Sequence, residues 1–356
     1  MNHITIYANF LKRFLNPKRK LKVVFDCSNG TTGMILKRLK IKDLRFKIIN
    51  DEPDGNFPAH GPNPWAEDAM NQLKKEVLRR KADLGIIFDA DGDRVFFVDN
   101  LGHVVEPDVI ARLLIWQLRP KKVVFDIRTS WLVKKIQDLR FKIYESRVGH
   151  FYIKKLMRKT GADLGVEKSG HYYFALRLVH QSFSIGESLD KGGLSYFDAG
   201  ILTAIEIINA VSKLPYSLAN FSDLLPQYYR SGEINIKIKN SNPKSQKFLL
   251  KKIEKYFKSK TTNPDARSGL RLKHRSYKLD GLTMEFEGWP ASRSLGEGGL
   301  ASRSLSEGWW FNIRPSNTEP LIRLNVEAES QKIFKEKKEE LKKLLLTINY
   351  PTIIQK

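Results

Sequence analysis

The stretch Phe88-Asp89-Ala90-Asp91-Gly92-Asp93-Arg94 places three carboxylates at alternate positions of one short segment. An apolar run, Leu84 to Phe88, precedes the carboxylates, and a second run, Val95 to Val98, follows them. This pattern predicts two buried strands joined by a tight turn. If the three carboxylates converge, they present hard oxygen ligands to one point, which suits Mg²⁺.

The carboxylate loop has two other possible interpretations. A helix–loop–helix calcium site requires Gly at the sixth position and Glu at the twelfth. Counted from Asp89, those positions hold Arg94 and Asn100, which excludes that class of site. The remaining alternative is a polar turn with solvated acids, which is less favoured because a turn needs no third Asp between two apolar strands.

Composition limits the class of protein. The chain has 356 residues, enough for two or three compact domains. Its single cysteine, Cys27, excludes an internal disulfide and favours a reducing compartment, and no stretch predicts a signal peptide or a membrane span, so we expect a cytoplasmic protein. The formal net charge of +23 attracts phosphate in any form, nucleic acid included. A nucleic acid is the less favoured partner, because the basic residues are spread along the whole chain.

An α/β fold is predicted on both sides of the carboxylate loop. Strands are expected at Leu21–Asp26 and Phe46–Ile49 and a helix over roughly Ala66 to Arg80, as in a βαβ unit. The turn Asn29 to Gly33 fits no nucleotide fingerprint, so tight-turn chemistry is favoured over a phosphate cradle. The carboxylate loop then lies at the carboxyl end of a sheet strand, where open α/β sheets bind ligands.

A second αβ unit follows, with strands expected at Lys122–Ile127 and Phe141–Tyr144 and a third strand ending at Val166. The next segment, Glu167-Lys168-Ser169-Gly170-His171, is rich in groups that bond sugar hydroxyls, although a plain polar turn is an equal alternative. His150 stands before another predicted helix, and a lone histidine is more often structural than catalytic.

The segment from Leu214 to Tyr229 resembles a linker, after which a smaller module begins near Glu233. Arg314-Pro315-Ser316-Asn317-Thr318-Glu319-Pro320 gathers an arginine, two hydroxyls and an amide in one turn, which is typical of a phosphate-binding loop. Arg323, in the predicted strand Leu321–Glu327, adds positive charge near that loop. A basic helix over roughly Gln331 to Leu346 is expected near the end of the chain.

Together, the three motifs resemble the α-D-phosphohexomutases, the phosphomannomutase/phosphoglucomutase family. The segments Asp26 to Gly30 and Pro53 to Pro58 also resemble that family, and the resemblance runs from about residue 5 onward. It implies a hexose phosphate substrate and a phosphoserine in the first of four domains. By this resemblance, Asp89, Asp91 and Asp93 would bind Mg²⁺, and Arg94 would face the phosphoserine. Contacts to the sugar hydroxyls would come from Glu167, Ser169 and His171, and Arg128 and His150 would line the cleft. The phosphate that does not react would be bound by Arg314, Ser316, Asn317 and Thr318.

The chain departs from the family pattern at the nucleophile. The family's Thr-Ala-Ser-His-Asn-Pro-like loop has no counterpart in these residues, so we expect a chain that lacks the phosphoserine domain and is truncated relative to the family. The isolated chain is then expected to be inactive. A separate first-domain polypeptide would complete a phosphotransferase of the isomerase class. The alternatives are an inactive phosphosugar-binding remnant and, less favoured, a basic nucleic-acid-binding protein.

The expected fold class is α/β, with two consecutive mixed-sheet αβ domains and a smaller α+β domain. The expected boundaries are 1–20 for a linker helix, 21–119 for the metal-loop domain, 120–215 for the sugar-loop domain and 230–356 for the phosphate-binding domain. In the last of these, Ala291 to Leu295 recurs as Ala301 to Leu305. The repeat predicts a dispensable insertion at 289–308, since its Ser, Gly and Arg residues can bury little.

Overall fold

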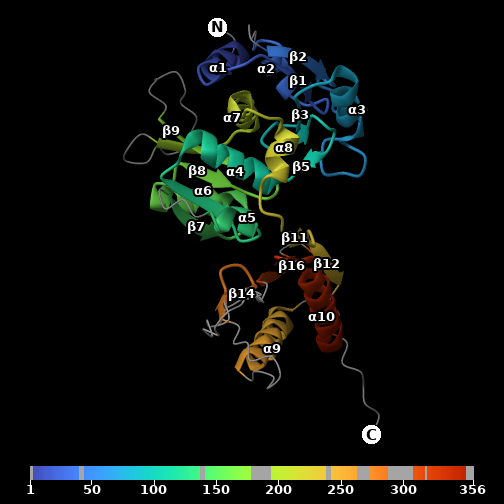
Figure 1. Ribbon diagram of the computed structural model, residues 1–356, viewed down its shortest axis with the longest axis vertical. Coiled ribbons are helices and arrows are strands. Elements are labelled where there is room, and N and C mark those ends of the chain that lie inside the picture. The colour runs from blue at the N-terminus through green and yellow to red at the C-terminus, as the bar shows by residue number, and fades with distance from the viewer. Residues whose placement is uncertain are drawn as a thin grey trace, which may run out of the picture. The chain divides into compact units, whose positions relative to one another are not determined.

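The structure, a computed structural model, describes residues 3–39, 44–136, 141–177, 194–237, 242–262, 273–287, 308–316 and 319–349. The chain divides into an N-terminal unit, Met1–Pro226, and a C-terminal unit, Gln227–Lys356, each with its own sheets and helices (Figure 1). Within the described residues, no helix is both long enough and apolar enough to cross a bilayer. The N-terminal unit contains the first two of the three sheets, and the C-terminal unit contains the third.

The first sheet has the strand order β2-β1-β3-β4-β5. β2, β1 and β3 run parallel, and β4 and β5 are antiparallel additions, so the sheet is mixed. Its strands are β1 (Leu21–Asp26), β2 (Leu44–Ile49), β3 (Leu84–Phe88), β4 (Val95–Asp99) and β5 (Val104–Val105). Every residue of β3 and β4 is buried, as the uninterrupted apolar runs predict for strands covered on both faces.

The helices that precede, separate or follow these strands along the chain are α1 (His3–Lys12), α2 (Thr32–Leu36), α3 (Asn71–Arg80) and α4 (Pro107–Leu118), of which α4 packs against α5 (Trp131–Lys134) and α7 (Gly200–Lys213). α3 covers one face, where its Leu73 and Val77 pack with Val24 and Ile87 of the strands. The prediction of a helix from Ala66 was wrong at its start, since residues 65–70 form turns and α3 begins at Asn71. The proline-rich segment before it supplies no helical cap, and Asp68 has a positive φ of 65°.

The second sheet has the order β10-β9-β8-β6-β7 and repeats the parallel core with antiparallel additions. Its strands are β6 (Lys122–Asp126), β7 (Lys142–Ser146), β8 (Leu164–Val166), β9 (Tyr172–Arg177) and β10 (Leu194–Asp198). Its helices are α5 (Trp131–Lys134), α6 (His150–Thr160) and α7 (Gly200–Lys213). α7 has buried residues from Gly200 through Ser212 and contacts β3, β4 and α4, so it ties the two sheets together.

The segment expected to be a linker is partly helical. α8 (Leu218–Asp223) is capped by Ser217, whose side chain accepts a hydrogen bond from the backbone N–H of Asn220 at 3.2 Å. Leu218 and Ala219 are buried in the N-terminal unit. A serine cap followed by an apolar pair is enough to nucleate one short helix, which the proline of Leu214-Pro215 had obscured.

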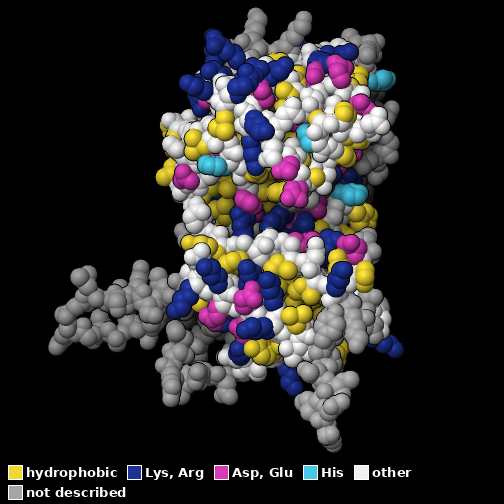
Figure 2. Space-filling model, turned by 90° about the vertical axis from the view of Figure 1, so that its right-hand side faces the viewer, with side chains coloured by type: hydrophobic (Ala, Val, Ile, Leu, Met, Phe, Trp, Pro, Cys, Tyr) yellow, Lys and Arg dark blue, Asp and Glu magenta, His cyan; other side chains and the backbone are white. Residues whose placement is uncertain are grey.

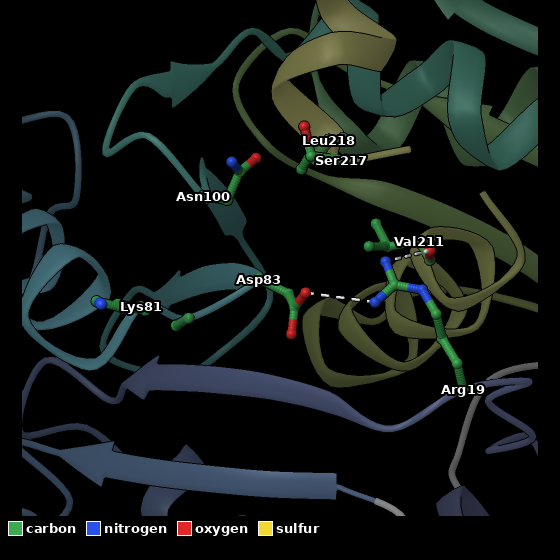
Figure 3. Close-up of a pocket in the computed structure, with 8 residues that line it drawn as sticks. Arg19, Lys81, Asp83, Asn100, Val211, Ser217 and Leu218 are labelled. Atoms are coloured by element: carbon green, nitrogen blue, oxygen red, sulfur yellow. Dashed lines mark hydrogen bonds and ion pairs between the residues drawn. The ribbon is translucent and has the colours of Figure 1, made fainter. Parts of the chain in front are cut away.

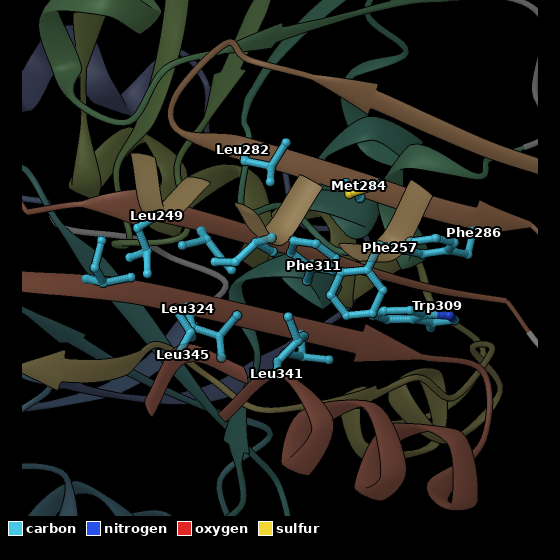
Figure 4. Close-up of a cluster of buried hydrophobic side chains, with 14 of the residues drawn as sticks. Leu249, Phe257, Leu282, Met284, Phe286, Trp309, Phe311, Leu324, Leu341 and Leu345 are labelled. Carbon is cyan, nitrogen blue, oxygen red and sulfur yellow. The ribbon is translucent and has the colours of Figure 1, made fainter. Parts of the chain in front are cut away.

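The C-terminal unit has an antiparallel sheet ordered β11-β16-β15-β14-β13, with β12 also pairing with β16. Its elements are β11 (Tyr229–Arg230), β12 (Ile234–Lys237), α9 (Pro243–Thr262), β13 (Lys273–Tyr277), β14 (Leu282–Glu287), β15 (Trp309–Pro315), β16 (Leu321–Ala328) and α10 (Gln331–Asn349). Its core joins strand and helix side chains (Figure 4), and Phe286 stacks on Trp309 with ring centroids 4.3 Å apart. Two αβ domains and a smaller α+β unit confirm the expected fold class.

Candidate active site

The three carboxylates of the loop between β3 and β4 converge. Asp89, Asp91 and Asp93 each offer an oxygen, and these oxygens lie within 4.8 Å of one another. Asp89 is buried, whereas Asp91 is exposed and the Asp93 side chain is 37% exposed. The cluster is therefore anchored on one side and open to solvent on the other. That arrangement fits Mg²⁺, which keeps part of its shell for water or phosphate.

The β1–α2 turn fixes the position of the carboxylate loop. The backbone N–H of Thr31 donates to the carbonyl of Ala90 at 2.9 Å, and Ser28 Oγ donates to the carbonyl of Phe88 at 2.5 Å. A Cβ on Gly30 would lie 2.2 Å from the Ala90 oxygen, so only glycine allows this approach. The glycine turn therefore supports the carboxylates sterically, a role that its sequence, read as a tight turn, did not predict.

Asp89 is held by groups from its own loop. Its Oδ1 accepts hydrogen bonds from the backbone N–H groups of Gly92 and Arg94, both at 3.1 Å. Its Oδ2 accepts from Nε of Arg94 at 2.6 Å. Burial raises the pKa of Asp89 to about 6 despite the Arg94 guanidinium, because desolvation disfavours the charged form. A bound cation would stabilise that charged form.

The segment Glu167 to His171, here called the Glu167 loop, connects β8 to β9. Glu167 is buried, and its Oε2 accepts a hydrogen bond from the hydroxyl of Tyr173 at 2.9 Å. Ser169 Oγ and His171 Nδ1 are hydrogen bonded at 2.9 Å. The three side chains expected to bind sugar hydroxyls therefore come from one turn whose polar groups are already oriented by neighbours.

The carboxylate loop and the Glu167 loop meet directly. His171 Nε2 lies 3.3 Å from Asp93 Oδ2, and the backbone N–H of Val95 donates to the carbonyl of Gly170 at 3.1 Å. Gly170 has a φ of +93°, and a Cβ there would lie 2.4 Å from the Phe96 ring of β4. Two sheets thus bring together motifs that lie 78 residues apart at Asp93 and His171.

The pKa values of this pair move in opposite directions. The hydrogen bond from His171 lowers the pKa of Asp93 to about 2. Burial alone would lower the pKa of His171, but the carboxylates of Asp93, Glu167 and Asp198 outweigh it and raise the pKa. An imidazolium beside ionised Asp93 is the state that this geometry favours.

Asp126, the last residue of β6, holds the Glu167 loop in place. This fully buried carboxylate accepts from the backbone N–H of Lys168 at 2.9 Å and from Nη2 of Arg128 at 2.7 Å. Arg128 Nη2 also lies 3.4 Å from Glu167 Oε1. The sequence analysis missed Asp126, although a strand-terminal Asp two residues before a candidate arginine was the available signal.

Asp198 and His150 also lie in the N-terminal unit, and only His150 was expected to belong to the site. Asp198, the last residue of β10, offers a ligand atom within 4.8 Å of those of Asp93 and His171. His150 begins α6 with an exposed side chain. Within the described parts of the chain, no hydrogen bond or ion pair joins His150 to the carboxylate loop or to the Glu167 loop.

In the C-terminal unit, two arginines of neighbouring strands share one carboxylate. Arg314 Nη2 lies 2.9 Å from Glu233 Oε2, and Arg323 Nη1 lies 3.1 Å from Glu233 Oε1. The Nε groups of both arginines are buried, and within the described residues neither has a hydrogen-bond partner. Ser316, two residues after Arg314, is buried. Asn317 and Thr318 lie outside the described residues.

Glu233 was not predicted as part of the phosphate-binding group. It stands immediately before β12, which pairs with β16, the strand of Arg323. Gly281 approaches the same region, because a Cβ there would lie 2.1 Å from the Ile313 oxygen. Two partnerless guanidinium N–H groups are donors available to an anion.

Comparison with known proteins gives three consecutive family matches. They are described as Phosphoglucomutase/phosphomannomutase, alpha/beta/alpha domain II, at residues 3–102; alpha/beta/alpha domain III, at residues 106–229; and C-terminal domain, at residues 233–344. A phosphomannomutase of Methanocaldococcus jannaschii is 33% identical over 347 residues, which cover 96% of this chain and 64% of that protein. The chain spans less than two thirds of the length of the curated relatives that it matches first.

Solved structures share the fold at lower identity. A phosphoglucomutase/phosphomannomutase family protein from Burkholderia thailandensis aligns with a TM-score of 0.72 at 21% identity, over 97% of this chain and 64% of that one. An N-acetylphosphoglucosamine mutase from Aspergillus fumigatus, solved with GlcNAc-6P and magnesium, aligns with a TM-score of 0.59 at 14% identity, over 98% of this chain and 66% of that one.

Proposed function

The chain belongs to the phosphoglucomutase/phosphomannomutase family, and from that premise we propose that it interconverts hexose 1-phosphate and hexose 6-phosphate when a separate first domain supplies the phosphoserine. The observation that carries the proposal is the ion pair between Asp93 and His171. It joins a candidate Mg²⁺ site to a candidate sugar site, as phosphoryl transfer to a sugar hydroxyl requires. A cytoplasmic location, suggested by the single cysteine, is part of the same proposal.

The N-terminal unit would supply the reacting half of the site. Asp89, Asp91 and Asp93 would hold Mg²⁺, which when bound offsets negative charge on the phosphoryl group. Arg94 would face the phosphoserine. The remaining residues would orient the sugar: Glu167, Ser169 and His171 at its hydroxyls, with Arg128 and His150 along the cleft.

The C-terminal unit would hold the phosphate that does not react. Arg314 and Arg323 are prearranged by Glu233 and keep buried Nε–H groups for an anion. Ser316, Asn317 and Thr318 would add hydroxyl and amide donors. Charge-assisted hydrogen bonds of this kind contribute about 1.5–3 kcal/mol each.

Metal binding is tested by calorimetry. We expect Mg²⁺ to bind the wild-type chain weakly, because water must take the place that a phosphoserine oxygen would fill. Asp91→Asn should abolish the heat, since it removes one carboxylate of three, while Asp223→Asn on the exposed end of α8 should leave it unchanged. Equal heats for Asp91→Asn and wild type would place the metal elsewhere.

Catalysis is tested by complementation. Ser169 is hydrogen bonded to His171, and neither Ser169 nor Ser316 has the sequence context of the family's nucleophile. We therefore expect no mutase turnover by the chain alone, even with glucose 1,6-bisphosphate. Turnover should appear when the first domain of the Methanocaldococcus jannaschii phosphomannomutase is added as a separate polypeptide, and Asp91→Asn should remove it. Robust turnover without that domain would contradict the proposal.

A second candidate function is phosphosugar binding without catalysis. The partnerless Nε groups of Arg314 and Arg323 favour it, because they require only an anion. Binding of glucose 1-phosphate with no turnover in the presence of the added first domain would select this function over the mutase.

A further inference from the structure

Two adjoining depressions form a basic trough at the edge of the first sheet opposite the carboxylate loop. One, of about 390 Å³, lies between β1, β2 and the end of α3, and the other, of about 220 Å³, lies where Asp83 meets Val211 and Leu218 (Figure 3). Ala82 lines both, so the two depressions are neighbours. The trough is at the amino ends of β1 and β3, whereas Asp89 follows the carboxyl end of β3.

The trough carries an excess of positive charge. Its basic lining residues are Arg19, Lys22, Arg45, Lys47, Arg80 and Lys81. Its one lining carboxylate, Asp83, is already engaged, since Oδ1 lies 3.3 Å from Arg19 Nη1 and Oδ2 accepts from the backbone N–H of Lys22 at 2.7 Å. Across the part of the chain that the structure describes, the side chains of Lys22, Arg45, Lys47 and Lys81 have no ion-pair partner.

Strand register explains why these residues gather. In the parallel pairing of β1 with β2, Lys22 lies beside Arg45 and Val24 lies beside Lys47, so their side chains share one sheet face. That face is the one that α3 covers through Val24, and α3 ends at Arg80. Arg79 and Arg80 both pair with Glu76, so this cluster of three side chains keeps one net positive charge.

The lining also indicates which kind of polyanion fits. Its apolar members Val23, Val24, Ala82 and Leu218 are buried and offer nothing for insertion into a lipid surface. Figure 2 shows Lys and Arg side chains gathered at the top of its view, on the N-terminal unit. Hollows lined by several cations suit a chain of phosphates. Depressions of about 220 and 390 Å³ can admit the phosphates of a single strand, whereas a duplex is too wide to enter them.

We propose that this trough binds the phosphate backbone of single-stranded nucleic acid, a function separate from the mutase site. The basic residues are spread evenly along the sequence, and the fold gathers six of them at one edge. Contacts would be made to phosphates without base readout, because no aromatic side chain other than Phe46 lines either lobe and Phe46 packs against Phe25.

Fluorescence anisotropy with a labelled single-stranded RNA tests the proposal. The variant Arg45→Ala/Lys47→Ala/Lys81→Ala removes three cations of the trough. The control variant Lys247→Ala/Lys251→Ala/Lys255→Ala removes three exposed cations of α9, so both chains have the same net charge. Loss of three phosphate contacts should make the log–log salt slope shallower by about 2, at roughly 0.7 for each contact.

The same slope sets the expected affinities. Between 50 and 200 mM salt, we expect the wild type to lose roughly 20-fold more affinity than the trough variant loses. The α9 control should behave as wild type. Equal weakening by both triple variants would overturn the proposal, since it would show binding through net charge alone. Equally tight binding of a duplex would also overturn the proposal. A trough variant that loses binding to anionic phosphatidylserine vesicles but keeps its RNA affinity would overturn it as well, since the trough would then bind a lipid surface.

Discussion

In the N-terminal unit the charged side chains of the candidate site bind one another, whereas in the C-terminal unit two arginines share one carboxylate and keep donors without partners. Asp126, Arg128 and Glu167 form one chain of contacts, and Asp93 pairs with His171. Arg314 and Arg323 instead share Glu233, Arg323 also pairs with Glu319, and both Nε groups are buried without a hydrogen-bond partner among the described residues. The first arrangement fixes loop geometry before a ligand arrives, and the second reserves hydrogen bonds for the ligand.

Removing Asp126 should have the largest effect on stability, because Asp126 belongs to the mutually bonded charged groups of the N-terminal unit. Asp126→Ala leaves the Lys168 N–H without its acceptor and removes the nearer of the two carboxylates at the part-buried Arg128 guanidinium, which we expect to cost about 3–5 kcal/mol of unfolding free energy. For a unit of this size, that is a fall in Tm of roughly 10 °C or more. Asp223→Ala, which removes an exposed carboxylate, should change Tm little. A Tm for Asp126→Ala near that of the control would mean that the loop is held by other contacts.

Arg314→Met should weaken ligand binding with less effect on the fold, since this arginine is predicted to serve an anion. Loss of one charge-assisted contact predicts a 10- to 100-fold rise in the Kd for glucose 1-phosphate, measured by calorimetry. Arg323→Met tests the second guanidinium, which is partly exposed and so less essential to packing. Arg275→Met removes an exposed arginine of β13 in the same unit and should leave the Kd unchanged. If neither site variant binds more weakly than Arg275→Met, the arginine pair is structural.

A third prediction concerns how the contribution of the His60–Asp26 ion pair in the N-terminal unit to stability changes with pH. His60 Nε2 lies 3.2 Å from both oxygens of the buried Asp26, and the hydrogen bond to Asp26 raises the pKa of His60 although burial opposes it. A raised folded-state pKa adds stability that is complete below the unfolded value of about 6.5 and is lost as pH rises through the folded-state pKa.

The destabilisation caused by His60→Gln, measured by urea unfolding, should therefore be greatest near pH 5.5 and smaller at pH 8.5. His103→Gln, which removes an exposed histidine near Asp99, serves as the control. A difference between wild type and His60→Gln that does not change with pH would show that His60 contributes as a neutral hydrogen-bonding group.

The smallest effect is expected for deletion of Trp289 to Gly308, the predicted insertion, most of which lies outside the described residues. β14 and β15 pair from Leu282 with Ile313 to Phe286 with Trp309, and the deletion joins Gly288 directly to Trp309. Loop-closure entropy varies slowly with length, by about 0.6 kcal/mol for each doubling, so Tm should move by only a few degrees. A large fall in Tm on thermal melting would mean that the insertion packs against the unit.

The sequence by itself determined the local elements and their chemistry. Uninterrupted apolar runs at Leu84–Phe88 and Val95–Val98 predicted buried strands, and the structure has β3 and β4 there. The alternating aspartates indicated a metal site on condition that they converge, and the structure brings their oxygens within 4.8 Å of one another. Element boundaries were displaced by a few residues, as at Asn71, where α3 begins without a side-chain cap after a run of turns that apolar periodicity does not reveal.

Only the tertiary structure decided which distant groups meet. Nothing local links Asp93 to His171, Glu233 to Arg314, or Lys22 to Arg45, because each contact depends on strand order and register rather than on neighbours in the chain. Asp126 and Gly30 likewise look ordinary in sequence, and their roles follow from a backbone N–H and a carbonyl brought in by other segments. Propensity and periodicity act over a few residues, whereas buried polar groups take their partners from wherever the fold places a donor.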